Sequence, residues 1–226
     1  MSRRYHHPAL PAPGERQTLP KDTSHHILQV CRHPRGEPLQ LFDGAGAEAH
    51  CLLVDVQGQR AVVECTALLP ACAPSRRVVL LLALCKPTAW ETSLRMATEL
   101  GVDLVQPVLA ERSTVRKLRL ERWQKLLVAA CEQSGRRWLP TLHEPLPLER
   151  ALRAPSLPSR RLLLSPDASP LPSASGDLAL LVGPEGGLSD QERAQALQAG
   201  FTPAGLGAHV LRVDTAVAAA LARYGC

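Results

Sequence analysis

The most constraining feature of the sequence is an uninterrupted run of eight apolar residues at positions 78–85, Val-Val-Leu-Leu-Leu-Ala-Leu-Cys. A strand with one face in water alternates apolar and polar residues, so a continuous run indicates a strand buried on both faces. Further strands are expected at residues 102–108, 162–164, 178–182 and 201–206. Helical segments separate them, and this alternation predicts an α/β layer with a mostly parallel sheet.

Local signals define the helices of this region. A helix is expected at residues 90–100, where Gly101 provides a C-cap, and another at residues 120–134. Ser189-Asp-Gln-Glu192 has the pattern of a capping box, which opens a helix that ends at Gly200. A last helix is expected at residues 213–224, whereas residues 154–175, rich in Pro and Ser, are expected to be loop around the 162–164 strand.

The first 75 residues have a different organisation. Apolar runs at residues 39–43, 47–56 and 60–66 are separated by glycine-containing turns, which is typical of β-hairpins. This pattern predicts a small β domain, expected to be a barrel, and the Pro-rich residues 69–75 are the expected linker. The sequence thus divides into a domain at residues 1–72 and a second domain at residues 76–226.

Composition narrows the class of protein. The chain has 226 residues, 45% of them hydrophobic and 21% charged, as expected of a globular protein with a core. No apolar run approaches the roughly 18–20 residues of a membrane span, and no apolar segment follows the basic N-terminus as in a secretory signal. The seven cysteines are odd in number, form no C-x-x-C pair and mostly lie in apolar runs. We therefore expect buried thiols in a soluble cytoplasmic protein, with no metal site.

The charge of the chain favours a polyanionic partner. The formal net charge is +5, and 22 of the 26 basic residues are arginines. Arginine binds phosphate in a bidentate manner and stacks on bases, so this surface suggests RNA, although a GC-rich coding background would raise the arginine content as well. Aromatic residues make up only 3% of the chain, which argues against a base-stacking sheet.

Two glycine-containing segments are the strongest candidates for a binding site. In the first, a predicted buried strand ends in Gly183-Pro-Glu-Gly-Gly187 and a capped helix follows at once. In the second, Gly205-Leu-Gly-Ala-His-Val-Leu-Arg-Val-Asp-Thr-Ala216 leads from a strand into the last helix. Glycines let the backbone approach a ligand beyond the carboxyl ends of strands, so the two segments predict a shared pocket. Neither contains a P-loop or a G-x-G-x-x-G pattern.

Simpler interpretations of both segments remain open. The first could be a plain tight turn. In the second, Asp214 or Thr215 could be a helix N-cap and Arg212 a surface charge.

These two segments resemble the RsmE family of ribosomal RNA methyltransferases, which belongs to the SPOUT superfamily. Further similar segments occur in the family's order along nearly the whole chain: His25-His-Ile-Leu-Gln-Val-Cys-Arg32, Phe42-Asp-Gly-Ala-Gly46, Ala97-Thr-Glu-Leu-Gly-Val102, Glu111-Arg-Ser113 and Ala130-Cys-Glu-Gln-Ser-Gly-Arg136. The resemblance implies a SPOUT-type α/β domain with a C-terminal trefoil knot, preceded by a small PUA-like β-barrel. It also implies methylation of N3 of a uridine in small-subunit (16S) ribosomal RNA, with S-adenosyl-L-methionine (SAM) as the cofactor and S-adenosyl-L-homocysteine as its product.

The resemblance implies partners and site residues as well. The substrate would be the ribosomal RNA or the assembled 30S subunit, and the chain would form a homodimer. The residues expected to bind SAM are Leu164, Ser165, Gly183, Pro184, Glu185, Gly186, Gly187, Leu206, Gly207, Val210 and Leu211. Those expected to contact RNA phosphates are Arg112, Arg116, Lys117, Arg119, Arg136 and Arg137. The alternative for each of these cations is a solvated charged surface.

Arg212 and Asp214 are the catalytic candidates. Methylation at N3 removes an imide proton, so a cation that stabilises the uracil oxygens and a nearby base would both help. Arg212 is the candidate for stabilising the uracil oxygens. Asp214 is the candidate for the base or for orienting Arg212. Asp214 could instead only cap the helix, and Glu185 could be a counter-charge to the sulfonium or only shape its loop.

The chain departs from the family pattern at Met96, His209, Val213 and Asp214, where the family usually has Lys, Arg, Thr and Glu. These departures keep two alternatives open. One is an RNA-binding or ribosome-assembly factor that binds SAM without catalysis, and the other is a SPOUT methyltransferase with another RNA target.

Overall fold

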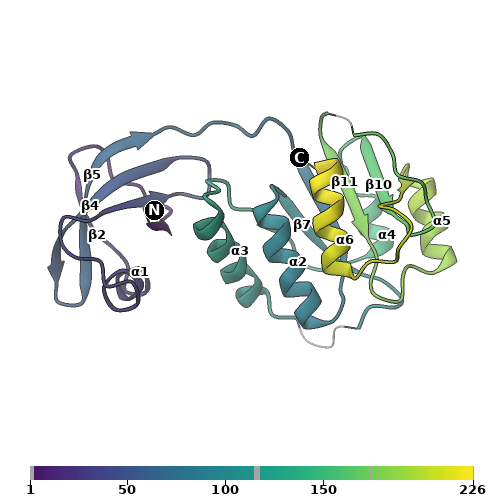
Figure 1. Ribbon diagram of the computed structural model, residues 1–226, viewed down its shortest axis with the longest axis horizontal. Coiled ribbons are helices and arrows are strands. Elements are labelled where there is room, and N and C mark those ends of the chain that lie inside the picture. Colours follow the sequence, from purple (N-terminus) through teal and green to yellow (C-terminus); the bar gives the residue numbers. More distant parts are fainter. Residues whose placement is uncertain (1–2, 115–117, 174, 226) are drawn as a thin grey trace. The chain divides into compact units, whose positions relative to one another are not determined.

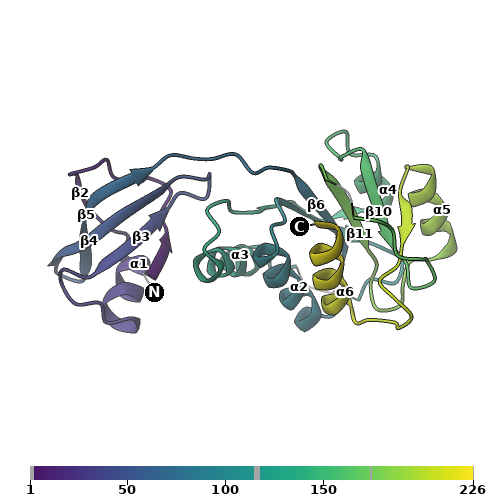
Figure 2. The same ribbon diagram turned by 45° about the horizontal axis from the view of Figure 1, so that its top comes forward.

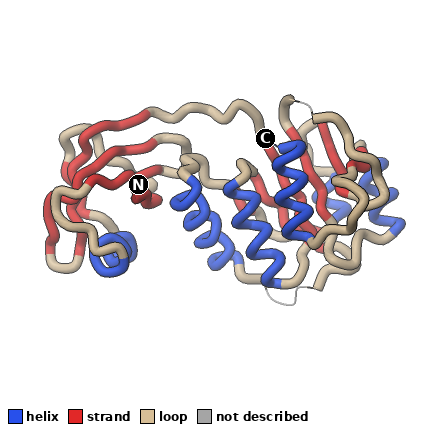
Figure 3. The backbone as a smooth tube through the Cα atoms, in the orientation of Figure 1, coloured by secondary structure: helices blue, strands red, loops and turns tan. Residues whose placement is uncertain are grey.

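The computed structural model describes residues 3–114, 118–173 and 175–225, which form two compact units. The first unit comprises Met1–Ala73 together with Cys131–Leu139, and the second comprises Pro74–Ala130 and Pro140–Cys226. The chain is shown along its length in Figure 1 and by secondary structure in Figure 3.

The first unit is a mixed β-sheet with a short helical segment. Its elements are β1 (Arg3–His6), β2 (Arg16–Thr18), α1 (Lys21–His25), the π-helical turn η1 (His26–Val30), β3 (Pro38–Phe42), β4 (Glu48–Gln57) and β5 (Arg60–Leu69). The strand order is β1-β3-β4-β5-β2, in which only the β1–β3 pairing is parallel among the described strands. The three longer strands were predicted within one to three residues. The sequence did not indicate β1, β2 or the helical segment, because each is only three to five residues long.

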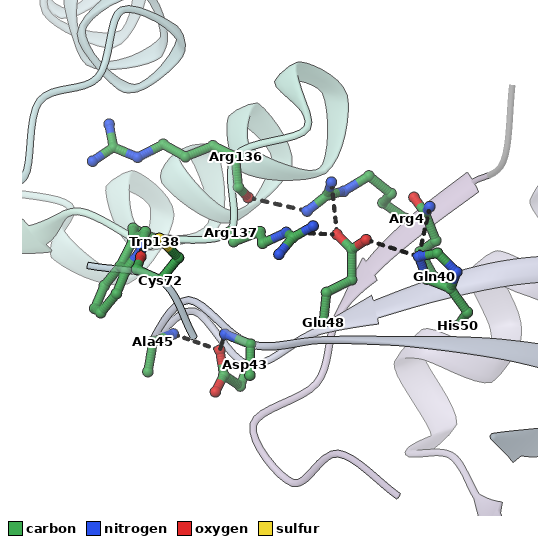
Figure 4. Close-up of polar contacts among 11 residues, drawn as sticks. Arg4, Gln40, Asp43, Ala45, Glu48, His50, Cys72, Arg136, Arg137 and Trp138 are labelled. Atoms are coloured by element: carbon green, nitrogen blue, oxygen red, sulfur yellow. Dashed lines mark hydrogen bonds and ion pairs between the residues drawn. The ribbon is translucent and has the colours of Figure 1, made fainter. Parts of the chain in front are cut away.

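Residues Cys131–Leu139 are part of this first unit (Figure 4). The Leu139 amide donates to the Gly44 carbonyl oxygen at 2.9 Å, and the indole of Trp138 donates to the Cys72 carbonyl oxygen at 2.9 Å. Gly46 has a φ of +102°, and a Cβ there would lie 2.5 Å from the Trp138 ring, so only glycine fits beneath this tryptophan.

A buried carboxylate joins three parts of this unit. The Glu48 side chain on β4 is 3% exposed, and its Oε2 lies 2.9 Å from Arg4 Nη1 and 3.5 Å from Arg137 Nε. Its Oε1 lies 3.2 Å from His50 Nε2 (Figure 4). Burial lowers the pKa of Arg4, and Glu48 counteracts this effect by favouring the charged guanidinium. The carboxylate therefore links β1 and β4 to the 131–139 segment.

The second unit is a parallel α/β layer. Its strands are β6 (Val78–Ala83), β7 (Leu104–Leu109), β8 (Thr141–Leu142), β9 (Leu146–Pro147), β10 (Arg160–Leu164), β11 (Leu178–Val182) and β12 (Thr202–Ala204). Its helices are α2 (Pro87–Glu99), α3 (Leu120–Ser134, whose last turn belongs to the first unit), α4 (Leu148–Leu152), α5 (Asp190–Gln198) and α6 (Val213–Ala220), which continues as the π-helical η2 (Leu221–Gly225).

The sheet order β12-β10-β11-β6-β7-β8, with β9 beside β7, is parallel throughout the described strands. Helices α2 and α6 lie side by side on one face and α4 and α5 on the other (Figures 1 and 2). All six residues of β6 are buried, which confirms the two-sided burial predicted from its apolar run. The predicted α3 and β11 coincide with the observed elements, whereas α2 starts three residues before its predicted start, with Pro87 at the first helical position.

Candidate functional site

The site lies where the strand order changes direction. From β6 the chain continues to β7 on one side, while β11, β10 and β12 lie on the other. The carboxyl ends of parallel strands share one edge, and a crevice opens between strands whose connections diverge. The segments that follow β6, β10, β11 and β12 meet at this edge and enclose a cavity of about 850 Å³.

The cavity brings together all eleven residues that the sequence predicted for cofactor binding, and both catalytic candidates. Its lining includes Leu164, Ser165, Gly183, Pro184, Glu185, Gly186, Gly187, Leu206, Gly207, Val210, Leu211, Arg212 and Asp214. The lining also contains residues that the prediction missed, among them Lys86, Thr88 and Arg193. Lys86 and Thr88 follow β6, and the residues after that strand contain no glycine motif.

Residues 183–187, here called the glycine loop, form a tight turn between β11 and α5. The Gly187 amide donates to the Pro184 carbonyl oxygen at 2.8 Å, and Gly187 has a φ of +70°, which an L-residue adopts only with strain. Glu185 Oε1 accepts a hydrogen bond from the Lys86 amide at 3.1 Å. Glu185 thus fastens the glycine loop to the segment after β6, which supports its shaping role.

The helix that follows begins with the capping box predicted from the sequence. Ser189 Oγ accepts a hydrogen bond from the Glu192 amide at 3.4 Å, and Glu192 Oε2 accepts one from the Ser189 amide at 2.9 Å. On the next turn of α5, Arg193 Nη2 donates to Ser165 Oγ at 2.6 Å. The wall after β10 is thereby attached to the helix after the glycine loop.

The second loop, residues 205–212, forms the opposite wall. The Gly205 carbonyl oxygen accepts a hydrogen bond from the Tyr224 hydroxyl at 2.7 Å, and the Gly205 amide donates to the Ser169 carbonyl oxygen at 3.1 Å. Further along the loop, Val210 is 82% accessible. The loop is therefore anchored at its start and open to solvent at its tip.

The two catalytic candidates lie at the beginning of α6. Arg212 is the N-cap residue, with an extended backbone and no capping hydrogen bond from its side chain, and the side chain is exposed. The interpretation of Asp214 or Thr215 as the N-cap is therefore wrong. Asp214 lies in the first turn, where its Oδ1 accepts a hydrogen bond from the Thr215 amide at 3.0 Å. A carboxylate in this place is favoured by the partial positive charge of the helix N-terminus.

Cys85 is a buried thiol next to this site. Burial, together with the Glu185 and Asp214 carboxylates that disfavour a thiolate, raises its pKa to about 12. The thiol therefore stays protonated near neutral pH, which excludes it as a nucleophile in this state.

The predicted RNA-binding cations are distributed over both units. Arg112 and Arg119 are exposed in the second unit, and Arg112 Nη1 donates to the Gly186 carbonyl oxygen at 2.7 Å. Arg136 and Arg137 belong to the first unit, where the Arg136 carbonyl oxygen accepts a hydrogen bond from Arg4 Nη2 at 3.3 Å. Arg116 and Lys117 lie outside the described residues.

Among the described residues, no group of three or more His, Cys, Asp or Glu side chains could hold a metal ion. None of the helices that the described residues form is long and apolar enough to cross a membrane.

Comparison with known proteins defines the class. Residues 72–225 match the model of the RNA methyltransferase domain, so this part of the chain is an RNA methyltransferase domain. Over 221 residues, the chain is 33% identical to the ribosomal RNA small subunit methyltransferase E of Synechocystis, covering 91% of this chain and 71% of the relative. The chain belongs to the ribosomal RNA small subunit methyltransferase E family.

Solved structures agree with this assignment. The fold is similar to the ribosomal RNA small subunit methyltransferase E from Neisseria gonorrhoeae bound to SAM, with a TM-score of 0.90, 33% identity and coverage of 98% of this chain and 96% of that one. A methyltransferase structure from Legionella pneumophila in complex with SAM has a TM-score of 0.89, 31% identity and the same coverage. These matches confirm the predicted SPOUT-type fold class.

Proposed function

We propose that this chain transfers a methyl group from SAM to N3 of a uridine in small-subunit ribosomal RNA. The observation that carries the proposal is the cavity of about 850 Å³ between the glycine loop and the second loop, in a chain that is 31–33% identical to relatives crystallised with SAM. The proposal includes an RNA-binding domain at residues 1–72 and a methyltransferase domain at residues 76–226, acting in the cytoplasm.

The residues around the cavity fit this cofactor. Its volume lies in the range of about 300–1,000 Å³ that is usual for small-molecule sites. At Gly187 no heavy atom lies within 4 Å of a built Cβ, so the backbone of the glycine loop is open there to the polar groups of a nucleoside and an amino acid. Leu164, Leu206 and Leu211 add apolar surface. The residues that would hold SAM are thus Leu164, Ser165, residues 183–187, Leu206, Gly207, Val210 and Leu211.

When bound, SAM supplies an electrophilic methyl group on a positively charged sulfur. The work left to the protein is to remove the imide proton of uridine and to stabilise the negative charge that spreads onto the uracil oxygens. Arg212, a permanently charged and exposed side chain that lines the cavity, is assigned to the oxygens. Asp214, two residues along on α6, is assigned to accepting the proton or to orienting Arg212.

Binding of RNA is assigned to the six basic residues that the resemblance implies. Arg119, Arg136 and Arg137, with Arg112, Arg116 and Lys117, are proposed to contact phosphates of the ribosomal RNA or of the assembled 30S subunit. Neutralising Arg119 and Arg136 together should weaken RNA binding and make it less dependent on salt concentration. An unchanged salt slope would remove both residues from this role. The homodimer is a further part of the proposal, and light scattering after size exclusion tests it.

The deciding experiment measures tritium transfer from labelled SAM to undermethylated small ribosomal subunits, followed by analysis of the nucleosides. Label in 3-methyluridine supports the proposal. SAM binding by calorimetry without transfer favours the non-catalytic alternative, and label in another nucleoside favours another RNA target. Arg212→Ala should abolish most turnover while SAM still binds, whereas Arg150→Met, which removes an exposed charge on α4 outside the cavity lining, should leave turnover unchanged.

A further inference from the structure

The loop after β7 is fastened to the glycine loop by Arg112. Its Nη1 donates to the Gly186 carbonyl oxygen at 2.7 Å. The aliphatic part of the same side chain covers Gly186, since a Cβ built on that glycine would lie 3.3 Å from Arg112 Cδ. The contact therefore combines a charge-assisted hydrogen bond with packing on the backbone.

A second fastening lies one residue earlier. The Glu111 amide donates to Glu192 Oε1 at 2.8 Å, while Glu192 Oε2 accepts the hydrogen bond from the Ser189 amide at 2.9 Å. Glu192 is 9% exposed, so these bonds are largely shielded from water. One buried carboxylate thus holds both the loop after β7 and the residue that starts α5.

The loop after β7 is itself a closed turn. The Ser113 amide donates to the Ala110 carbonyl oxygen at 3.0 Å, and Ser113 Oγ accepts a hydrogen bond from the Ala110 amide at 3.0 Å. A turn closed in this way is a rigid support for the glycine loop, which it contacts at Gly186.

We propose that Arg112 and Glu192 are positioning residues for the cofactor: they hold the glycine loop in its binding shape before SAM enters. A loop with three glycines in five residues has large conformational freedom, and ordering it on binding would weaken affinity. Two bonds fasten the glycine loop itself, Glu185 to Lys86 and Arg112 to Gly186. The two bonds of Glu192 hold the segments on which the loop rests, at Glu111 and at Ser189. This inference rests on the proposed function, because it assumes that the cavity binds SAM.

Arg112 has two proposed roles, and they affect different binding affinities. A side chain that only contacts RNA phosphates affects RNA binding and its salt dependence and leaves SAM affinity without RNA unchanged. A side chain that holds the glycine loop affects SAM affinity when no RNA is present.

The test is calorimetric titration of SAM into the whole chain without RNA, for wild type, Arg112→Met and the control Arg150→Met. Methionine keeps most of the apolar stem of Arg112 and removes the donor. We expect the Kd for SAM to rise about 3- to 10-fold in Arg112→Met, as for loss of one hydrogen bond, and to stay unchanged in Arg150→Met. In turnover assays the KM for SAM should rise by a similar factor, with kcat at saturating SAM nearly retained.

Glu192→Gln provides a second variant. The glutamine side chain keeps one acceptor oxygen of Glu192 and loses the other, so the Kd for SAM should rise. The midpoint temperature of thermal unfolding reports separately any loss of stability. Wild-type SAM affinity in both Arg112→Met and Glu192→Gln would overturn the inference, as would an Arg112→Met variant that loses only RNA affinity. Failure of the wild-type chain to bind SAM would instead refute the proposed function.

Discussion

Replacing Gly205 by alanine should destabilise the second unit strongly, because the added methyl group meets main chain rather than a movable side chain. A Cβ at position 205 would lie far inside the van der Waals contact distance of the Ala168 carbonyl oxygen, 2.7 Å from the Ala168 carbonyl carbon and 3.3 Å from the Ser169 carbonyl carbon. No rotamer change relieves this clash. Either the 205–212 loop or the 168–169 backbone must move, and both adjoin the cavity walls.

The expected loss of stability is obtained by comparing Gly205 with Gly176. Overpacking costs typically about 1–3 kcal/mol, and a main-chain clash belongs at the upper end, about 3 kcal/mol. Gly176, in the loop before β11, has a φ of +97° and no heavy atom within 4 Å of a built Cβ. Alanine there costs only the left-handed backbone strain, about 1 kcal/mol. For a chain of this size 1 kcal/mol shifts Tm by about 2–4 °C, so Gly205→Ala should lower Tm by about 6–12 °C and Gly176→Ala by about 2–4 °C.

Thermal unfolding of wild type and both variants, monitored by circular dichroism, measures these shifts. SAM titration of the same samples should show weaker binding for Gly205→Ala, since its substitution displaces a cavity wall, and unchanged binding for Gly176→Ala. A Gly205→Ala variant no less stable than Gly176→Ala would refute the argument from main-chain contact.

Three further predictions concern the first unit and the thiols. Glu48→Gln should lower the free energy of unfolding in urea by about 3–5 kcal/mol, because it leaves the desolvated Arg4 without its carboxylate partner. Glu64→Gln, which breaks an exposed ion pair with Arg16, should lower it by less than about 1 kcal/mol. Equal losses in the two variants would contradict the role of burial. Burial lowers the pKa of His7 in the folded chain, so His7 binds a proton more readily in the unfolded chain. The free energy of unfolding should therefore fall as the pH drops below about 6.5. The stability difference between wild type and His7→Gln should change over that range, and parallel profiles would refute the assignment. Brief alkylation at pH 8, mapped by mass spectrometry, should modify the exposed Cys72 first. Cys51 and Cys85 should react later, because burial raises the pKa values of their thiols to about 12. Early modification of either buried thiol would refute this order.

Much of the second unit could be predicted because its signals are local. The unbroken apolar runs define β6 and β11, the helical periodicity defines α3, and Ser189 and Glu192 are close enough in the chain for their reciprocal bonds to be evident as a motif. The first unit was less accessible, because β1 is only Arg3–His6 and becomes a strand by pairing with β3, more than 30 residues away.

The sequence alone determined the α/β alternation and the two glycine-containing segments, since glycine and apolar patterns act over a few neighbouring residues. The eleven expected cofactor residues came from the resemblance to the RsmE family. Only the tertiary structure decided that Lys86 and Arg193 line the same cavity and that residues Cys131–Leu139 pack with the first unit. Only the tertiary structure, too, joined Arg112 to a glycine carbonyl 74 positions along the chain. Such contacts depend on which strand ends meet at one edge of the sheet and on which backbone groups face an available donor. Neither condition leaves a periodic pattern in the sequence.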